Sequence, residues 1–387
     1  MKEKVQAPEL RFPGFTDDWE LRKLGEITEV ITKGSTPLDK SWSGPVNYVK
    51  TESINKDNGQ ISMTANTSLE EHENYLKRSK LKDGDLLFSI VGTLGRVGLV
   101  EEKDLPANTN QQISIIRLCE GDKYFLFNTL KTHRIISFIK SDATIGAQPS
   151  LSLWQIEGLS VPFPNIKEQV KIGSFFKQLD TTITLHQRKL DLLKEQKKGY
   201  LQKMFPKNGA KVPELRFAGF ADDWEERKLG EVYNFQYGQF NNNPDNGGQY
   251  PIYGANGIIG GYDEYNSENA IVIGHMGAYA GHVLWAEGKH FVTYNGTMGI
   301  ADKSILNSNF GYYLVVSVNV PKLTSGSGQP FVSYSDLNGI KILIPTIEEQ
   351  QKIGSFFKQL DDTIALHQRK LDLLKEQKKG FLQQMFV

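Results

Sequence analysis

The chain has 387 residues, 39% of them hydrophobic and 11% aromatic, which is enough for two or three domains with sizeable cores. Lysine and arginine together number 45 and so do aspartate and glutamate, a balance that is not the basic excess of a protein binding DNA unaided. The single cysteine, Cys119, excludes an intramolecular disulfide and any zinc site built on paired cysteines. No stretch approaches about eighteen consecutive apolar residues and the start has no apolar signal region, so we expect a soluble cytoplasmic protein.

Two repeats divide the chain into halves. The segment PELRFPGFTDDWELRKLGEITE at 8–29 returns as PELRFAGFADDWEERKLGEVYN at 213–234, and the stretch at 168–205 returns at 349–386 with 33 of 38 positions identical. The offsets are 205 and 181 residues, so the part between the repeats is 24 residues longer in the first half. Each half therefore reads as an arm, a variable domain and a long helix.

These repeats set the expected domain boundaries. We expect an arm at 1–24, a variable domain at 25–164, a long helix at 165–205, a linker with the second arm at 206–229, a second variable domain at 230–344 and a second long helix at 345–387.

The first variable domain contains short apolar runs between turns rich in glycine and asparagine, which is the pattern of strands. Examples are DLLFSIVG at 85–92 and QISIIRL at 112–118, and one helix is predicted near the end, at 123–140. The domain is therefore predicted to be a mixed α+β domain.

The second variable domain follows the same plan. Strands are predicted in YPIYGANGIIGGY at 250–262, AIVIGHMG at 270–277 and KILIP at 341–345, and a helix at 310–320. TIGAQPSLSLWQIEGLSVPFP at 144–164 also aligns with 324–345. We therefore expect one fold to carry both domains.

The two long helices carry an apolar seam whose members step by four and three residues, the heptad spacing of a helix that packs against another helix. Each helix is preceded by a capping residue, Asn165 or Thr346, three positions ahead of a glutamate. His186, Lys197, His367 and Lys378 interrupt the seam and are expected to set its register or mark a fraying end. The seam residues are Ile172, Phe176, Leu179, Ile183, Leu190, Leu193, Ile353, Phe357, Leu360, Ile364, Leu371 and Leu374.

Catalytic motifs are missing from the sequence. It has no phosphate-binding P-loop, no HExxH zinc motif and no GxSxG elbow, and Asn243-Pro244 is followed by Asp245 instead of the proline of an adenine methylase. We therefore predict a non-catalytic chain with no metal site.

Polar and amide-rich loops are the candidate binding groups, because asparagine and glutamine can pair with base edges. Such loops are also ordinary turns, so the assignment is a hypothesis. The second variable domain has few cations, with 4 lysines and no arginine against 8 acidic residues over 231–345, so most phosphate neutralisation is expected from a partner. The candidate DNA-binding residues are Lys33, Ser35, Thr36, Lys50, Thr51, Ser53, Asn110, Gln111, Tyr237, Gln239, Asn241, Asn256, Tyr279, Tyr294 and Asn295.

The paired arms, the Gln-Pro before each long helix, and the two helices ending in KKG-LQ-MF resemble the specificity subunit of a type I restriction-modification system over the whole chain. The resemblance implies an α+β protein with two similar target recognition domains, separated by an antiparallel coiled coil of the two long helices in a pseudo-two-fold, circular arrangement. Each domain would read one half of a split, asymmetric DNA site. The near identity of the two helices also suggests either recent duplication or recombination between specificity genes.

The same resemblance implies partners. These are double-stranded DNA, two methyltransferase subunits that use S-adenosylmethionine to methylate adenine, and restriction subunits that use ATP and Mg for translocation and cleavage. No cofactor is expected in this chain and no membrane contact. The alternative is a coiled-coil adaptor whose two domains bind protein or glycan, and a free-standing nuclease or methylase is disfavoured by the missing motifs.

Overall fold

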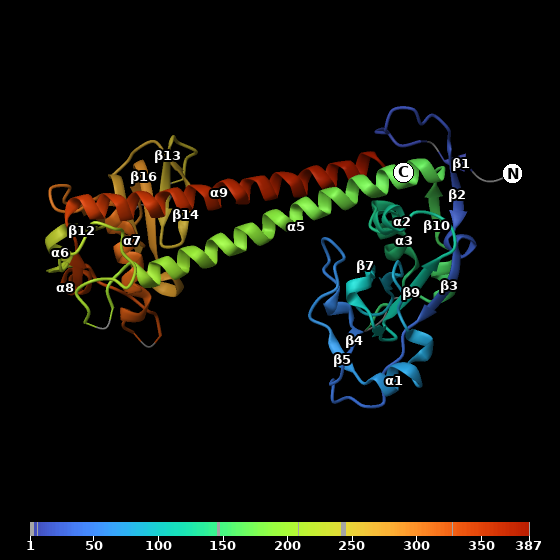
Figure 1. Cartoon of the computed structure of the whole chain (residues 1–387). Helices are drawn as coiled ribbons and strands as arrows, with labels where there is room; N and C mark the ends of the chain where they lie inside the picture. The colour runs from blue at the N-terminus through green and yellow to red at the C-terminus, as the bar shows by residue number, and fades with distance from the viewer. Residues whose placement is uncertain are drawn as a thin grey trace. The chain divides into compact units, whose positions relative to one another are not determined.

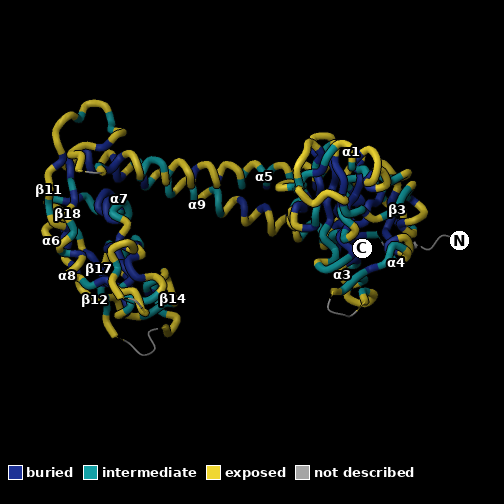
Figure 2. The backbone as a smooth tube through the Cα atoms, turned by 90° about the horizontal axis from the view of Figure 1, so that it is seen from below, coloured by how far each residue is buried: buried dark blue, intermediate teal, exposed yellow. Residues whose placement is uncertain are grey.

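The protein is described by a computed structural model covering residues 4–5, 7–144, 148–207, 209–240, 245–326 and 328–386. Its chain forms two compact units, Met1–Gln187 with Lys370–Val387, and Arg188–Arg369. Each unit combines one variable domain with parts of both long helices (Figure 1). Buried residues concentrate inside the globular part of each unit, whereas the long helices keep exposed residues along their length (Figure 2).

The first unit is built on three sheets. Their strand orders are β1-β2-β10, β3-β9-β6-β7 and β5-β4-β8, and every pair is antiparallel except β4 with β8. The predicted strands at 85–92 and 112–118 are confirmed as β6 and β9, which pair with each other. The strands are β1 (Lys4–Val5), β2 (Trp19–Lys23), β3 (Thr28–Lys33), β4 (Val46–Val49), β5 (Ala65–Thr67), β6 (Leu86–Ser89), β7 (Val97–Leu99), β8 (Ala107–Thr109), β9 (Ile113–Leu118) and β10 (Ser160–Phe163).

The single helix predicted at 123–140 is wrong in one respect, because the structure divides it in two. Thr132 has an extended backbone, and its hydroxyl donates to the carbonyl of Thr129 at 2.8 Å. This local hydrogen bond competes with helix continuation. The helices of the unit's globular part are α1 (Leu69–Glu73), α2 (Lys123–Thr129), α3 (His133–Asp142) and α4 (Leu153–Glu157), with short 3-10 turns η1 (Leu24–Ile27), η2 (Thr51–Ser53), η3 (Lys77–Ser79) and η4 (Glu102–Asp104).

The second unit has one six-stranded sheet in the order β12-β17-β15-β16-β13-β14 and a two-stranded ribbon of β11 with β18. The predicted strands at 250–262, 270–277 and 341–345 are confirmed, and the predicted helix at 310–320 is confirmed as α7. The strands are β11 (Glu225–Lys228), β12 (Tyr233–Tyr237), β13 (Tyr250–Gly254), β14 (Gly257–Tyr262), β15 (Ser267–Gly274), β16 (Val283–Val292), β17 (Gly296–Ala301) and β18 (Lys341–Ile344). The helices are α6 (Leu229–Val232), α7 (Ser308–Val318) and α8 (Tyr334–Gly339), with η5 (Gly277–Tyr279) and η6 (Val320–Leu323).

The two globular parts share a strand plan. In the second unit, the ten-residue β16 pairs with β15 and, at its end, in parallel with β13. In the first unit, β7 pairs with β6 and the separate strand β8 pairs in parallel with β4. One long strand therefore takes the place of two short ones, and one continuous sheet takes the place of two sheets.

The long helices are α5 (Ile166–Lys203) and α9 (Ile347–Gln384), each of 38 residues. In the first unit Phe175, near the start of α5, contacts Phe381, near the end of α9, with ring centroids 5.1 Å apart. In the second unit Tyr200, near the end of α5, contacts Phe356, near the start of α9, at 5.0 Å. Within each unit the two helical segments therefore run in opposite directions.

The seam residues lie on the less exposed side of these helices. Most are buried, and Leu179, Leu360 and Ile364 are half-buried. The chain after each helix also enters a core: Phe386 contacts Trp19 and Phe125 in the first unit, and Phe205 contacts Trp224 and Phe310 in the second. Each globular core is thus completed by aromatic rings from both repeats.

The two lysines that interrupt the seam form equivalent ion pairs in the two units. Lys378 Nζ lies 2.6 Å from Asp180 Oδ1 in the first unit, and Lys197 Nζ lies 2.6 Å from Asp361 Oδ1 in the second. The spacing between the repeats, 181 residues, relates both lysines and both aspartates. These pairs are satisfied only when the helices adopt this register, as expected of a polar seam residue.

Candidate nucleic-acid interface

In the first unit, three chain segments that carry predicted DNA-binding residues meet at one edge. Because β4 and β8 are parallel, their carboxyl ends lie at the same edge of their sheet. The segment after β3 reaches the same place through Gly34, where a Cβ atom would lie only 2.1 Å from the carbonyl oxygen of Thr109. Ser35 N then donates to that oxygen at 3.0 Å. Only glycine allows this approach.

The first recognition edge, as we call this place, is made of Lys33, Ser35, Thr36, Lys50, Asn110 and Gln111. Lys50 is held over an aromatic ring, with Nζ 3.8 Å from the centroid of Trp42. Tyr48 stabilises the edge, because its hydroxyl donates to the carbonyl of Ser35 at 2.8 Å. Burial raises the pKa of Tyr48 to about 12. A lysine ammonium fixed at such an edge could meet a phosphate or a base acceptor.

Gln111 and Thr36 form a pair across this edge. The hydroxyl of Thr36 donates to Oε1 of Gln111, which is exposed. Asn110 is occupied within its own turn, because its Oδ1 accepts from the backbone N–H of Gln112 at 3.1 Å and its Nδ2 donates to Gln112 Oε1 at 3.2 Å. Gln111 is therefore the more available amide of the two.

Two other predicted DNA-binding residues take part in the internal structure of the domain. Thr51 and Ser53 are buried. Ser53 Oγ accepts from the backbone N–H of Lys50 at 3.3 Å and donates to the carbonyl of Met63 at 3.4 Å. Arg96 donates to the carbonyl of Thr51 at 2.9 Å. Thr51 and Ser53 thus shape the loop after β4 and present little surface to a ligand.

The second unit builds an edge in the same way. A Cβ atom at Gly238 would lie 2.1 Å from the carbonyl oxygen of Thr293, as at Gly34. Gln239 N donates to the carbonyl of Val292 at 2.9 Å, and Tyr294 N donates to the carbonyl of Gln239 at 3.0 Å. The second recognition edge consists of Tyr237, Gln239, Phe240, Tyr294 and Asn295.

Aromatic rings dominate this second edge. The Tyr237 ring lies 4.4 Å from that of His275 and 4.9 Å from that of Tyr334, measured between centroids. Phe240 lies 5.4 Å from Tyr294. The edge therefore offers apolar and stacking surface where the first offers a hydroxyl, an amide and a lysine.

Two further predicted residues lie beside the end of β15. A Cβ atom at Gly274 would lie 2.1 Å from the carbonyl oxygen of Tyr279 and 3.3 Å from the Cβ of Ala255, the neighbour of Asn256. The hairpin turn with Asn256 and the short η5 turn with Tyr279 therefore approach the same strand end. Asn241 lies outside the described residues.

Matching hydrogen bonds extend the correspondence between the units. Ile90 N donates to the carbonyl of Gln112 at 2.8 Å, and His275 N donates to the carbonyl of Asn295 at 2.8 Å. Gly92 N donates to the carbonyl of Pro149 at 2.9 Å, and Gly277 N donates to the carbonyl of Pro330 at 2.8 Å. The second pair explains the shared Gln-Pro of the sequence, because both prolines lie beside the strand end that supports an edge.

Comparison with known proteins explains why the chain contains two similar domains, each flanked by a repeated arm and a repeated long helix. The family of the type I restriction modification DNA specificity domain matches residues 16–195 and 221–376. The chain belongs to the family of type I restriction-modification DNA specificity subunits.

The specificity subunit has relatives along its whole length. It is 24% identical over 413 residues to the type I restriction enzyme MjaVIII specificity subunit of Methanocaldococcus jannaschii, a match that covers 96% of this chain and 92% of the relative. The crystal structure of the type I restriction-modification system S subunit from M. genitalium matches with a TM-score of 0.74 and 18% identity, covering 99% of both chains. A chain from a study of complex assembly and conformational transition of the type I R-M system matches with a TM-score of 0.52 and 19% identity over 97% of both. Both structural matches show that the fold is shared.

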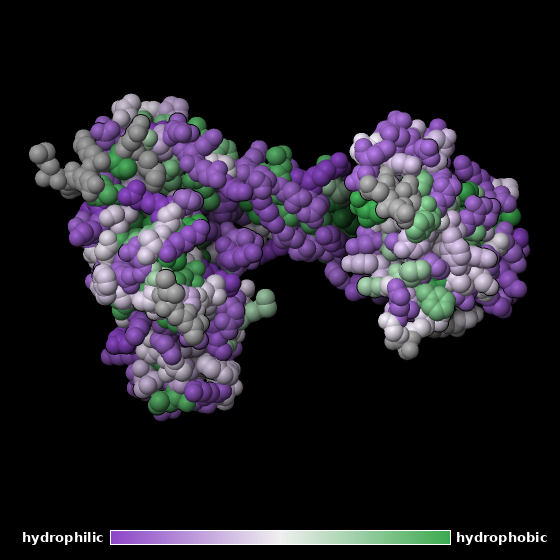
Figure 3. Space-filling model, turned by 180° about the vertical axis from the view of Figure 1, so that it is seen from behind, coloured by the Kyte–Doolittle hydropathy of each residue, from purple (hydrophilic) through white to green (hydrophobic). Residues whose placement is uncertain are grey.

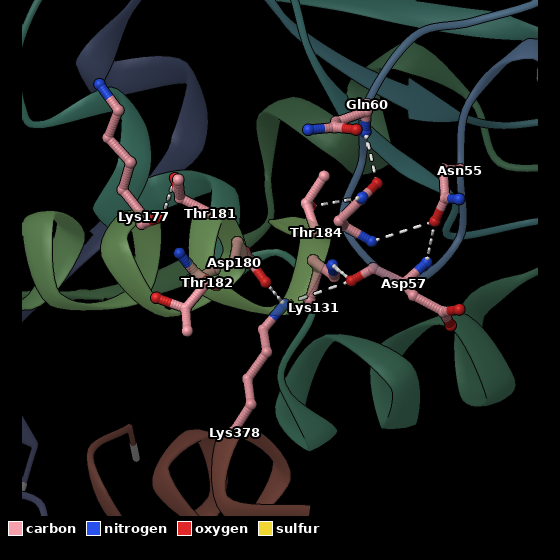
Figure 4. A network of polar contacts seen from close by, with 12 residues as sticks. Asn55, Asp57, Gln60, Lys131, Lys177, Asp180, Thr181, Thr182, Thr184 and Lys378 are labelled. Atoms are coloured by element: carbon pink, nitrogen blue, oxygen red, sulfur yellow. Dashed lines mark hydrogen bonds and ion pairs between the residues drawn. The ribbon is translucent and has the colours of Figure 1, made fainter. Parts of the chain in front are cut away.

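The first domain of this specificity subunit is fastened to the helices by a polar network (Figure 4). Lys131 Nζ and Lys378 Nζ both donate to the carbonyl of Asp57, at 2.6 and 3.2 Å, and Lys378 also pairs with Asp180. The pKa of Lys131 is lowered to about 7. Burial is the largest cause, and the positive charge of Lys378 is the second. The loop that contains Asp57 is thereby tied to α5 and α9 within the first unit.

A neighbouring contact is specific to the first unit. Asn58 Nδ2 donates to Thr184 Oγ1 on α5 at 3.4 Å. The repeat has Ala365 at the position of Thr184, so this contact has no counterpart on α9. In the second unit Asp361 instead accepts a hydrogen bond of 2.8 Å from the hydroxyl of Tyr313. The lysine-aspartate pair is therefore the same in both units, but the group of the globular domain that contacts it differs.

Sequence reasoning missed Trp42, Arg96 and Phe240. Each acts through a tertiary contact, with Lys50, with the carbonyl of Thr51 and with Tyr294 respectively. Of these three residues, only Phe240 could have been identified from the sequence, because it follows Gly238 by two residues as Thr36 follows Gly34. Among the described residues, no group of three or more His, Cys, Asp or Glu side chains could hold a metal ion, and no helix is long and apolar enough to span a membrane.

Proposed function

We propose that this chain is the DNA sequence-recognition subunit of a type I restriction-modification complex, acting in the bacterial cytoplasm. One observation carries the proposal: two domains of the same strand plan present differently composed edges at matched positions, Gly34 with Thr109 and Gly238 with Thr293. A shared scaffold with unlike edges is what reading two unlike half-sites requires, because sequence is read by side chains that reach base edges.

Each recognition domain reads one half of a bipartite, asymmetric site, and the helices α5 and α9 form an antiparallel coiled coil that sets the spacing between the halves. Each helix has 38 residues, about 57 Å at 1.5 Å per residue, which exceeds the roughly 34–36 Å of one DNA turn. The antiparallel packing within each unit and the repeated lysine-aspartate pairs support this arrangement and its pseudo-two-fold symmetry.

The chain itself is non-catalytic in this proposal. Two methyltransferase subunits bind it and methylate adenine with S-adenosylmethionine, and restriction subunits use ATP and Mg. The charge balance supports a division of labour: with 45 basic and 45 acidic residues, the chain supplies base readout while its partners supply much of the phosphate neutralisation.

The test is a methylome. The intact chain is co-expressed with its cognate methyltransferase subunit in a host that lacks adenine methylation, and N6-methyladenine is mapped by single-molecule sequencing. A split asymmetric motif with one methylated adenine in each half is expected. If the complex is soluble and no new motif arises, the recognition role fails.

A further inference from the structure

The two recognition edges differ most at one matched pair of positions. Thr36 follows Gly34 by two residues and contacts Gln111, in the turn between β8 and β9. Phe240 follows Gly238 by two residues and contacts Tyr294, in the turn between β16 and β17. The backbone geometry at both glycines is the same, since each faces a threonine carbonyl at 2.1 Å from a would-be Cβ.

In the first domain this pair is polar. Thr36 donates to Oε1 of Gln111, which leaves the two N–H groups of the Gln111 amide with no hydrogen-bond partner among the described residues. An exposed glutamine amide can donate and accept along one base edge, and adenine, with its N6 donor and N7 acceptor, is the base that matches it. The Thr36 contact holds the amide in a defined orientation, which lowers the conformational entropy lost on binding.

In the second domain the same position is aromatic. The Phe240 side chain is 71% exposed and Tyr294 is 41% exposed, although their rings are in contact. The visible face of each unit is mostly hydrophilic, with hydrophobic side chains in small separate areas (Figure 3). In the major groove, the apolar feature of a base pair is the C5 methyl group of thymine, which phenylalanine contacts well.

We propose that this matched pair determines specificity at one base pair in each half-site. Thr36 and Gln111 read adenine through hydrogen bonds, whereas Phe240 and Tyr294 read thymine through its methyl group. This inference rests on the proposed DNA-recognition function and deepens it by assigning a base type to each edge.

The first test is the methylome described above, repeated with Q111A and F240A. Q111A should relax the motif at one adenine position in one half, with a loss of discrimination of at least about fivefold, and should leave the other half unchanged. F240A should do the reverse at a thymine position in the other half. I300A is the matched control, because Ile300 is also exposed but pairs with Asn234, at the opposite end of β12 from Phe240.

The second test isolates the methyl group. Binding of the intact complex with its methyltransferase subunits is measured on a duplex that contains the motif, with the assigned thymine replaced by uracil, which lacks only that methyl. The wild-type complex should lose roughly fourfold in affinity, the effect of one buried methyl group. The F240A complex should bind both duplexes equally, because its methyl contact is already gone.

The outcomes separate the two proposals. If the wild-type complex produces no bipartite motif, the DNA-recognition function itself fails. If the wild-type motif forms and F240A leaves every position unchanged, the assignment of Phe240 and Tyr294 is overturned. The assignment is also overturned if F240A lowers methylation equally at all sites without changing the motif, since the aromatic pair would then contact a protein partner.

Discussion

The guanidinium of Arg11 donates two hydrogen bonds of 2.8 Å to the carboxylate of Glu168, one from Nε and one from Nη2. Arg216 and Glu349 make the same pair in the second unit, also at 2.8 Å. The Glu168 side chain is fully buried and that of Arg11 is 11% exposed. The hydrogen bonds to Glu168 raise the pKa of Arg11, so the guanidinium keeps its charge. Each pair fastens an arm to the first turn of a long helix.

Replacing Arg11 by alanine should destabilise the first unit strongly. The substitution leaves the Glu168 carboxylate buried without its partner, and such losses cost about 3–5 kcal/mol in the free energy of unfolding. Urea denaturation of the intact chain measures the effect. K211A is the matched control, because Lys211 lies 3.5 Å from Asp223 in an ion pair whose side chains are 70% and 65% exposed. An exposed pair contributes little, so equal losses for R11A and K211A would contradict this account.

The arm pairs also show where sequence reasoning reached its limit. The asparagine cap of α5 was predictable, and Asn165 Oδ1 accepts from the backbone N–H of Glu168 at 3.0 Å. The glutamate three residues after the cap suggested a reciprocal capping box. Its carboxylate binds Arg11 instead, a residue 157 positions earlier in the chain. A contact at that separation leaves no local pattern, although the repeat of Arg216 with Glu349 could have indicated it.

Much of the fold could be predicted because its signals are local or repeated. The heptad seam predicted both long helices, and short apolar runs predicted β6, β9 and β15. At the recognition edges, Gln111 was predicted from its residue type, whereas Phe240 was not, because its position depends on Gly238 facing the carbonyl of Thr293. The burial of Thr51 could not be predicted either, because it depends on how the loop after β4 packs in the folded domain.

Two glycines of α5 should respond to alanine in opposite directions. A Cβ atom at Gly173 would lie 2.1 Å from Asp122 Oδ1, the atom that caps α2 by accepting from Phe125 N at 2.8 Å. G173A should therefore lower the free energy of unfolding by about 1–2 kcal/mol, as the loss of a cap does. At Gly199 nothing lies within 4 Å of a Cβ atom. G199A should raise the free energy of unfolding by about 0.5–1 kcal/mol, because alanine favours the helix.

Thermal melting of the two variants beside the wild type checks this pair of signs. The repeat offers a second copy of the experiment, since a Cβ atom at Gly354 would lie 2.7 Å from Phe310 N while Gly380 has nothing within 4 Å. G354A should therefore behave like G173A, and G380A like G199A. A stabilising G173A would mean that α2 does not depend on its close approach to α5.

Removing the Tyr313 hydroxyl should weaken the second unit. The hydroxyl donates to Asp361 Oδ2 at 2.8 Å, and Lys197 Nζ pairs with the same carboxylate. A hydrogen bond to a charged group contributes about 1.5–3 kcal/mol, so Y313F should lower the free energy of unfolding by about that amount. Burial and this hydrogen bond raise the pKa of Tyr313, so the loss should be the same at pH 6 and pH 9.

Tyr312 is the matched control for that measurement. It is the adjacent residue on α7, burial raises its pKa to about 12, and its hydroxyl has no hydrogen bond to a described residue. Y312F should therefore leave the urea midpoint close to that of the wild type. A Y312F loss as large as that of Y313F would mean that ring packing, and not the bond to Asp361, carries the effect.

Lys131 should make the stability of the first unit depend on pH above neutrality. Its pKa is about 7 in the folded chain, mainly because of burial and also because of the Lys378 charge, whereas Asp180 and Asp57 act in the opposite direction. The ordinary value is 10.5, so between about pH 7 and pH 10 the unfolded chain binds more protons at this residue than the folded chain. The free energy of unfolding therefore rises with pH across that window, and below about pH 7 the contribution is flat because both states are protonated.

The K131M variant isolates this effect, since a methionine of similar length cannot titrate. Melting temperatures of wild type and K131M are compared at pH 6.5 and pH 9, with K140M as control because Lys140 is an exposed lysine on α3. The wild type should gain stability relative to K131M as the pH rises, while its difference from K140M should stay constant. A wild-type minus K131M difference that is independent of pH would mean that Lys131 remains charged in the fold, with its hydrogen bond to the carbonyl of Asp57 and the nearby Asp180 offsetting its burial.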